Sequence, residues 1–338
     1  MKKNNDNVKV TVWCLAYNHE KYIRTALEGF VNQKTNFAYE VIIHDDASTD
    51  KTAEIIREYE EKFPQIIKPI YQTQNQYQLG VLKSLNFLLP NLKGCYVAFC
   101  EGDDYWCDEN KLQVCYDCLE ADDKLAICVH KTQCLNDDGT LINQTIPPGD
   151  VCDRDRIFKP EDFADWIWKS RITYPFHTSS FLVRREVLEA QFYRKLAEKR
   201  LLNGDEVILR SAMIHGNIYY VDKIMSCRRL WTINNYNNRF KKKSDEEKLK
   251  FWLKTLDGDL LFNEMSEKRF DDRIVTYVYR RLLSMARTYD VERIITYLNE
   301  LSKTHPLPST ASWKIKFAYW MFRAFPYAYR GIFGKSKN

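Results

Sequence analysis

The sequence predicts an α/β fold in which helices flank a mostly parallel, doubly wound sheet and a helical extension follows at the C-terminus. Residues 8–15, 39–44 and 96–100 are apolar and rich in β-branched or aromatic side chains, which is typical of buried strands. Segments with apolar residues at helical spacing separate them. Short alternating units of strand and helix favour a parallel sheet.

Composition describes a folded globular chain, with 45% hydrophobic and 29% charged residues among 338. The N-terminus is polar, without the apolar stretch of a signal peptide, and no apolar run approaches the length of a membrane span. We therefore expect a cytoplasmic protein. The net charge of +5 is mild and excludes no class of partner by itself; we expect no nucleic acid among the partners.

The strand at 39–44 runs into an acidic turn, Asp45-Asp-Ala-Ser-Thr-Asp50. Either Ser48 or Thr49 is the expected N-cap of the helix that follows. A third helix is expected from Val81 to Leu89, where leucines recur at helical spacing. Ligands of doubly wound sheets bind at the carboxyl ends of the strands. Tyr17, Asp45 and Asp103 each lie just past a predicted strand end, so we expect the acids on one rim.

The apolar strand at 96–100 ends abruptly in Glu101, Gly102, Asp103 and Asp104. Three carboxylates so close together repel one another and lose hydration at a strand end, unless a cation or backbone donors neutralise them. Mg²⁺ and Mn²⁺ prefer such oxygen ligands. The alternative is an acidic turn that caps a helix beginning near Asp108.

Beyond residue 130 the pattern is less regular. We expect a short helix at 163–168, a strand with a polar entry at 177–184, a helix opening at Gly204-Asp205 and a strand at 217–227. Residues 245–301 are helical in character, with Ile274, Val278 and Leu282 at suitable spacing.

The C-terminal stretch 313–333 is crowded with aromatic residues and contains basic residues but no acidic ones. On a helix, Trp313, Phe317, Trp320 and Ala324 form one stripe, which suits the interface of an anionic membrane. The alternative is that the stripe packs on the preceding helices while the basic residues are solvated.

Three motifs in this order carry a resemblance: Val12-Trp-Cys-Leu-Ala-Tyr-Asn18, Val41-Ile-Ile-His-Asp-Asp-Ala-Ser-Thr-Asp50, and the stretch from Tyr96 to Trp106. The chain resembles the family 2 inverting glycosyltransferases of the GT-A fold, of the bacterial surface-glycan type. The resemblance implies a glycosyltransferase domain over 1–230, with a nucleotide-sugar-binding half at 8–130 and an acceptor-binding half at 131–230. Residues 231–338 then form the helical C-terminal region.

Site residues follow from the resemblance. Ala16, Tyr17 and Asn18 would line the uracil of a UDP-sugar, and Asp45 would accept the imide proton of the base. Asp46 and Asp103 belong to the same nucleotide site. The Glu101-Gly-Asp103 triplet matches the family's Asp-x-Asp motif. We expect Mn²⁺ or Mg²⁺ on Asp103, Asp104 and Glu101.

The family's catalytic base is an acid at the start of a helix beyond the acceptor region. Asp205 fits this position, and Glu206 is the alternative; the competing interpretation is that Asp205 only caps its helix. Weaker expectations place His177, Thr178 and Trp106 at the acceptor. A basic residue that approaches the diphosphate is expected near Arg228, Arg229 and Trp231, where the local pattern departs from the family's usual Arg-x-His.

The resulting prediction is a metal-dependent enzyme that transfers a sugar from a UDP-sugar to a glycan or lipid-linked acceptor with inversion, in capsule, lipopolysaccharide or exopolysaccharide synthesis. It would work at the inner face of the cell membrane. Two alternatives stay open: a catalytically silent nucleotide-sugar-binding or scaffold subunit, and a metal-dependent nucleotidyltransferase. The second lacks the expected support of a Gly-rich phosphate loop after the first strand.

Overall fold

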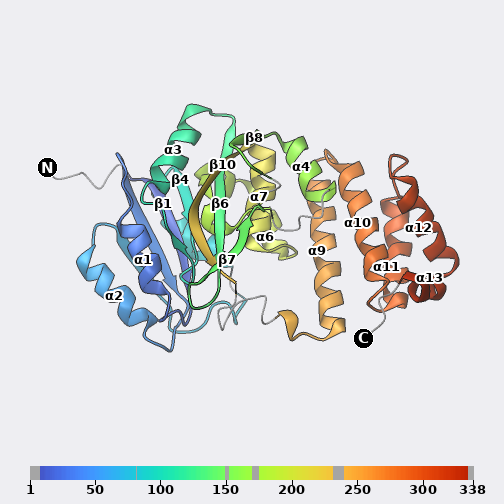
Figure 1. Ribbon diagram of the computed structural model, residues 1–338, viewed down its shortest axis with the longest axis horizontal. Helices are drawn as coiled ribbons and strands as arrows, with labels where there is room; N and C mark the ends of the chain where they lie inside the picture. The colour runs from blue at the N-terminus through green and yellow to red at the C-terminus, as the bar shows by residue number, and fades with distance from the viewer. Residues whose placement is uncertain (1–7, 81, 149–151, 170–174, 231–239, 334–338) are drawn as a thin grey trace. The chain divides into compact units, whose positions relative to one another are not determined.

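A ten-stranded sheet organises the first part of the chain. The structure is a computed structural model that describes all residues except 1–7, 81, 149–151, 170–174, 231–239 and 334–338. The chain divides into two units (Figure 1). The first comprises Met1–Phe163, Ile172–Lys199 and Asn203–Asn238, and the second comprises Ala164–Arg171, Arg200–Leu202 and Arg239–Asn338.

Within the described residues, the strands lie in the order β3-β2-β1-β4-β9-β6-β10-β5, with β7 beside β6 and β8 beside β10. Strands β1 to β4, β6 and β10 all run in one direction, since parallel pairs or the antiparallel strand β9 connect them. The predicted α/β class with a mostly parallel sheet is confirmed, and β9 is an antiparallel insertion. The strands are β1 (Val8–Ala16), β2 (Ala38–Asp45), β3 (Ile67–Tyr71), β4 (Tyr96–Phe99), β5 (Tyr105–Trp106), β6 (Leu125–Leu135), β7 (Leu141–Ile146), β8 (Arg156–Phe158), β9 (Leu182–Arg184) and β10 (Asn217–Arg229).

Helices cover the sheet through the apolar faces that the sequence predicts. In the first helix, Ile23, Ala26, Leu27 and Phe30 are buried. Each large apolar side chain buried in this way contributes about 1.5–3 kcal/mol to the free energy of unfolding. The helices that lie wholly within this unit are α1 (Ile23–Val31), α2 (Thr52–Lys62), α3 (Lys111–Ala121), α5 (Arg185–Glu189), α6 (Gln191–Lys199) and α7 (Gly204–His215).

Local details differ from the predictions at three places. The N-cap of α2 is Lys51 and not Ser48 or Thr49, because the Ser48 hydroxyl turns back to the Asp45 carboxylate. The third predicted helix is two short turns, η1 (Ser84–Leu88) and η2 (Leu89–Asn91), which include Pro90 without a backbone N–H; Val81 lies outside the described residues. The strand expected at 177–184 is shortened to β9, since His177 caps the turn η3 (Thr178–Ser180).

The second unit is helical, as the spacing of its apolar residues predicts. Ile274, Val278 and Leu282 are fully buried. The Trp168 ring, from the end of α4 (Pro160–Lys169), lies 5.8 Å from the rings of both Phe262 and Phe270. None of the helices in the described part of the chain is both long and apolar enough to cross a membrane. The other helices of this unit are α9 (Asp245–Met265), α10 (Asp271–Met285), α11 (Val291–Thr304), α12 (Trp313–Ala324) and α13 (Pro326–Phe333).

Candidate active site

The carboxyl ends of β1, β2 and β4 meet at one edge of the sheet, because these neighbouring strands are parallel. The loops after β1 and β4 touch at Gly102, whose N–H donates to the Leu15 carbonyl over 2.8 Å. A Cβ atom at Gly102 would lie 2.8 Å from Ile23 Cδ1 and 2.9 Å from His19 Nδ1. A glycine inside the acidic stretch is therefore required by this close approach.

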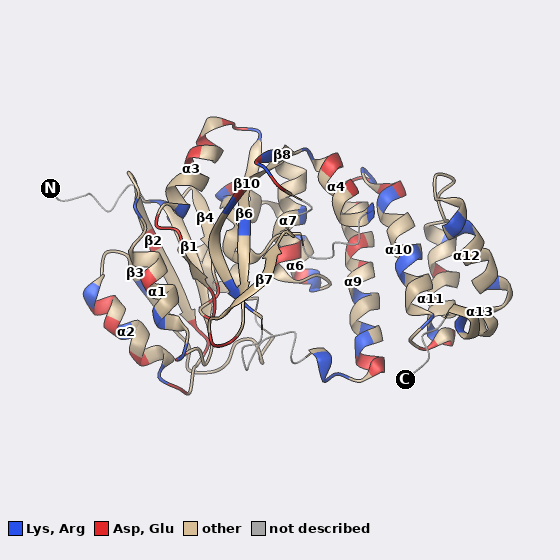
Figure 2. Ribbon diagram, viewed as in Figure 1, with Lys and Arg blue, Asp and Glu red and all other residues tan. Residues whose placement is uncertain are grey.

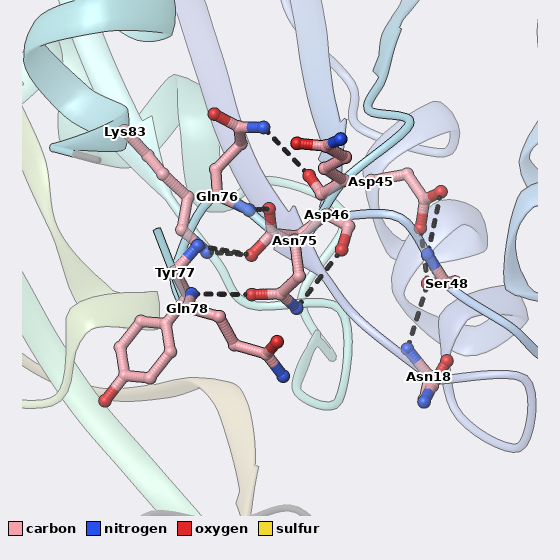
Figure 3. Close-up of polar contacts among 10 residues, drawn as sticks. Asn18, Asp45, Asp46, Ser48, Asn75, Gln76, Tyr77, Gln78 and Lys83 are labelled. Atoms are coloured by element: carbon pink, nitrogen blue, oxygen red, sulfur yellow. Dashed lines mark hydrogen bonds and ion pairs between the residues drawn. The ribbon is translucent and has the colours of Figure 1, made fainter. Parts of the chain in front are cut away.

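The loops after β1 and β2 hold each other through side chains of polar residues (Figure 3). Asn18 adopts a left-handed backbone conformation with φ 55°, which asparagine tolerates well. Its N–H donates to Ser48 Oγ over 2.9 Å, and its Oδ1 accepts from the Thr49 N–H over 2.8 Å. Ser48 in turn donates to Asp45, a buried carboxylate whose pKa burial raises. These bonds place Asp45 beside the loop that contains the half-buried Tyr17.

Asp46 is buried and surrounded by donors (Figure 3). Its carboxylate accepts from the N–H of Gln76 at 2.7 Å, the N–H of Tyr77 at 3.2 Å and Lys83 Nζ at 2.8 Å. Burial alone would raise the pKa of Asp46, but Lys83 and the two N–H groups hold that pKa below its usual range. Asn75 Nδ2 donates to the Asp46 carbonyl over 3.3 Å. Asp46 thus fastens the loop after β3 to the rim.

Glu101 and Asp104 lie beside His177. One donor atom from each of the three lies within 4.8 Å of the other two. Glu101 Oε2 is buried and has no hydrogen-bond partner. Burial, followed by the charges of Asp103 and Asp205, raises the pKa of Glu101 to about 7. Burial, followed by the charges of Asp103 and Glu101, also raises the pKa of Asp104. Two carboxylates and one imidazole so placed, with a negative charge that Arg228 offsets only in part, are a donor set that fits a divalent cation.

His177 is 5% exposed and enters the cluster from the turn before β9. Its Nε2 lies 3.4 Å from Asp104 Oδ2, and its Nδ1 lies 2.7 Å from Ser179 Oγ. Burial, together with the nearby Arg228 guanidinium, lowers the pKa of His177 well below its ordinary value, so the ring is neutral. Thr178 follows on the same turn and is half-buried.

Asp205 and Glu206 open α7, as predicted, but they have different surroundings. The N-cap is Asn203, and Glu206 completes its capping box by accepting from the Asn203 N–H over 2.9 Å. The cap is therefore built without Asp205. Asp205 is close enough to the acidic cluster for its charge to contribute to the raised pKa of Glu101.

Arg229 ends β10 and braces the acidic stretch. Its N–H donates to Asp104 Oδ1 over 2.8 Å, and its Nη1 donates to the Asp103 carbonyl over 2.7 Å. Arg228 is close enough for its charge to lower the pKa values of Glu101 and Asp104 against the effect of burial. Trp231 lies outside the described residues.

Trp106 is 3% exposed and packs in the core. Its ring lies 4.9 Å from the Phe30 ring, with Lys111 Nζ 4.2 Å above it, and its Nε1 donates to the Ser179 carbonyl over 2.9 Å. These contacts leave little of the ring for a bound acceptor. Trp106 instead supports the turn that carries His177.

Sequence reasoning overlooked Lys83 and the loop 75–77 that together neutralise Asp46. The signal was the run of Asn and Gln residues at 72–78, which directly follows a strand and is typical of a loop. It also assigned His177 to the acceptor and not to the acidic cluster.

Comparison with known proteins identifies the family and the fold. The sequence model of glycosyl transferase family 2 matches residues 11–192. An uncharacterized protein of Mycobacterium tuberculosis is 42% identical over 139 residues, which cover 41% of this chain and only 39% of that protein. An uncharacterized glycosyltransferase of Nostoc sp. is 26% identical over 291 residues, covering 86% of this chain and 83% of the relative.

Among solved structures, residues 1–349 of TarS from S. aureus, in complex with UDP-GlcNAc, superpose with a TM-score of 0.61 at 17% identity. The superposition covers 96% of this chain and 88% of that one, and at this identity it shows a shared fold. The family match spans more than half of the sequence and contains the loops after β1, β2 and β4 as well as His177. The chain therefore belongs to glycosyltransferase family 2.

Proposed function

We propose that the protein is a metal-dependent, inverting glycosyltransferase that moves a sugar from a UDP-sugar donor to a hydroxyl of a glycan or lipid-linked saccharide. The observation that carries the proposal is the rim formed by β1, β2 and β4, where Glu101 and the buried Asp104 lie together and have raised pKa values although Arg228 offsets part of their charge. Membership of family 2 supports the reaction class. The UDP-GlcNAc complex of TarS supports the nucleotide class.

In this proposal the loops after β1 and β2 bind the nucleotide. Ala16, Tyr17 and Asn18 line the uracil, and Asp45 accepts the proton of its imide. A buried carboxylate is a strong acceptor for such an N–H. Asp46 acts indirectly, since its own oxygens already accept from the loop 76–77 and from Lys83.

Glu101, Asp103 and Asp104 are the residues that would hold Mn²⁺ or Mg²⁺. A bound divalent cation supplies charge neutralisation for the diphosphate leaving group. The chain itself keeps the Asp104 carboxylate oriented through the N–H of Arg229, 2.8 Å from Oδ1. Asp103 lies between Glu101 and Asp104 in the sequence, and in this proposal it also contacts the nucleotide.

Asp205 is the proposed general base. It takes the proton from the acceptor hydroxyl as that oxygen bonds to the anomeric carbon and the bond from this carbon to the diphosphate oxygen breaks. Attack from the face opposite the leaving group inverts the anomeric centre. Glu206 is a weaker choice because it accepts hydrogen bonds in the helix cap. Thr178, on the turn beside the cluster, is a candidate acceptor contact.

We further propose that the reaction takes place at the inner face of the cell membrane, in the synthesis of a bacterial surface polysaccharide. The stripe of α12 supports contact with an anionic membrane: Trp313, Phe317 and Trp320 are 71%, 51% and 56% exposed. Lys and Arg residues accompany them on α12 and α13 (Figure 2). Aromatic and basic residues combined on an exposed helix suit the membrane interface.

Calorimetric titration with UDP tests the nucleotide site. We expect binding with Mn²⁺ that is lost with excess chelator and in Asp103→Ala. Asp205→Asn should keep this binding while turnover falls by about 10²–10⁴-fold, the usual contribution of a general base. Unchanged turnover in Asp205→Asn would remove Asp205 from its role, and release of pyrophosphate from a nucleoside triphosphate would indicate nucleotidyl transfer instead.

Membrane contact has a separate test with vesicles. The variant with Trp313, Phe317 and Trp320 all changed to Ser should lose binding to phosphatidylglycerol vesicles, while its binding of UDP is retained. Since these side chains are exposed, the change leaves the packing of Phe322 and Tyr329, which are buried and 5.4 Å apart, in place. Equal vesicle binding by both proteins would contradict membrane contact through α12.

A further inference from the structure

We propose that His177 is a nitrogen ligand of the divalent cation, together with Glu101 and Asp104, and that a chain of buried hydroxyls fixes its ring for this purpose. The inference rests on the proposed function, in which a cation binds at this rim. It assigns His177 to the metal and not to the acceptor.

The possible ligand atoms of Glu101, Asp104 and His177 lie close together. His177 Nε2 lies 3.4 Å from Asp104 Oδ2, and a Glu101 oxygen lies within 4.8 Å of both of their donor atoms. Ligand atoms that each lie about 2.0–2.6 Å from one ion are roughly 3–5 Å apart from one another, which includes the distances in this group. Asp103 is not part of this group of three in the described residues, although it is the neighbour of Asp104 in sequence.

The acidic cluster also has a carboxylate oxygen that no group in the described residues satisfies. His177 is 5% exposed, and its Nε2 faces the Asp104 carboxylate at 3.4 Å. Glu101 Oε2 is buried without a hydrogen-bond partner. A buried carboxylate oxygen in this state is costly unless a ligand compensates it, and a cation between Glu101, Asp104 and the lone pair of His177 would do so.

Buried hydroxyl groups hold the imidazole ring of His177 from its Nδ1 side. A histidine that binds a metal through Nε2 carries its proton on Nδ1, and it donates this proton to a partner that fixes the ring. Ser179 Oγ lies 2.7 Å from His177 Nδ1. Ser179 Oγ donates to Ser226 Oγ over 2.9 Å, and Ser226 Oγ lies 2.9 Å from Thr132 Oγ1.

All members of this hydroxyl chain are buried, and Ser179 Oγ donates away from His177, to Ser226 Oγ. Ser179 Oγ can therefore accept a hydrogen bond from Nδ1–H while it donates to Ser226 on β10. Ser226 in turn is hydrogen-bonded to Thr132 on β6. The Ser179 N–H donates to Nδ1 over 3.3 Å and so caps η3, and a cation on Nε2 would replace this bond by one from Nδ1–H to Ser179 Oγ. Trp106 holds Ser179 from its other side through the Ser179 carbonyl.

A nitrogen ligand changes which cation the site prefers. Mg²⁺ demands hard oxygen ligands and near-ideal octahedral geometry, whereas transition-metal ions accept imidazole. We therefore expect the wild-type protein with UDP to bind Mn²⁺ at least tenfold more tightly than Mg²⁺. His177→Gln should lower the affinity for Mn²⁺ at least tenfold and the affinity for Mg²⁺ by less than threefold.

Pulsed EPR of Mn²⁺ bound to the wild-type protein with UDP tests the ligand directly. We expect ¹⁴N modulation that changes to a ¹⁵N pattern when the histidines are isotopically labelled, which needs no variant to fold. The modulation should disappear in His177→Gln and persist in His19→Gln, which changes the other histidine beside the acidic stretch.

Two serines provide a matched pair for the hydroxyl chain. Ser226→Ala should keep the ¹⁴N signal and weaken Mn²⁺ binding by about tenfold, as is usual when the partner of a ligating histidine loses its orientation. Ser180→Ala should leave Mn²⁺ binding unchanged, because Ser180 Oγ donates to the His177 carbonyl and does not touch the ring.

Failure would be informative in two distinct ways. Mn²⁺ that binds without any nitrogen modulation overturns the assignment of His177 and leaves the metal-dependent transferase standing. No binding of Mn²⁺ with or without UDP, in a protein that still binds UDP, overturns both the ligand and the metal dependence of the proposed function.

Discussion

Two acidic groups follow strands β2 and β4 of the same sheet, and their surroundings differ. Asp46, after β2, accepts from Lys83 at 2.8 Å and from two backbone N–H groups, and its pKa lies below the usual range. Glu101, after β4, has a buried oxygen without a hydrogen-bond partner, and its pKa is raised to about 7. Only β1 separates the two strands.

The difference separates a structural carboxylate from one available to a ligand. Around Asp46 the chain provides every compensating group itself, and the result is a loop fastened to the rim. Around Glu101, burial and then the charges of Asp103 and Asp205 raise the pKa, and the charge of Arg228 offsets them only in part, which is the arrangement that a bound cation would complete in the proposed function. Uncompensated charge in a buried position is typical of functional sites, because its cost to stability is kept only where binding or catalysis requires it.

Removal of Lys83, the cation paired with Asp46, should have the largest effect on the free energy of unfolding. In Lys83→Met the Asp46 carboxylate stays 1% exposed but loses its cation, which should lower the free energy of unfolding by about 3 kcal/mol. Urea unfolding at pH 7 measures the loss. The double variant Lys83→Met with Asp46→Asn should recover part of it, since no buried charge then remains. A single variant as stable as the wild type would mean that the two N–H groups suffice.

The stability of the region around Asp46 should also depend on pH, because of His44, which directly precedes the two aspartates. Burial, then the charge of Lys83, lowers the pKa of His44 to about 4. Between pH 6.5 and 4 the unfolded chain then binds more protons at this residue than the folded one, so stability falls as pH falls. From pH 8 to pH 5 the loss from this residue should be about 2 kcal/mol.

His44→Phe should abolish this part of the acid sensitivity. The ring lies between Trp13 and Phe87, with centroid distances of 5.8 and 4.8 Å, so a phenyl ring fits the aromatic surroundings. Urea unfolding of both proteins at pH 8 and pH 5 gives the difference. If the variant loses as much stability as the wild type between these values, His44 is not the responsible group.

Sequence reasoning located the rim because its signals are local. An apolar strand that stops at an acid, as at Asp45 and at Glu101, can be recognised within one stretch of about ten residues, and the parallel sheet then brings such ends together. The helix start at Asp205 was found in the same way. Its capping box, Asn203 with Glu206, was also readable from the spacing but was overlooked.

The contributions of His177 and Lys83 depend on tertiary structure and had no local signal. His177 reaches Asp104 because the antiparallel strand β9 inserts beside β4, which nothing near His177 in the sequence specifies. Lys83 lies where the periodicity of leucines predicts a continuous helix, and the structure has a loop and short turns instead. Non-local pairing of strands and loops is what a pattern within one segment cannot predict.

The smallest expected effect has the opposite sign to that of Lys83→Met, and it is the sharpest test of the comparison. Glu101→Gln removes a charge that the protein compensates only in part, so with excess chelator at pH 8 it should raise the free energy of unfolding by about 1 kcal/mol. Asp46→Asn, the matched change on the compensated side, should lower it, because a carboxylate with three donors is replaced. Addition of Mn²⁺ and UDP should then reverse the order of wild type and Glu101→Gln, since only the wild-type carboxylate gains a cation. If Glu101→Gln is the less stable protein even with chelator, then Glu101 is compensated within the chain, and the contrast between the two acidic groups does not hold.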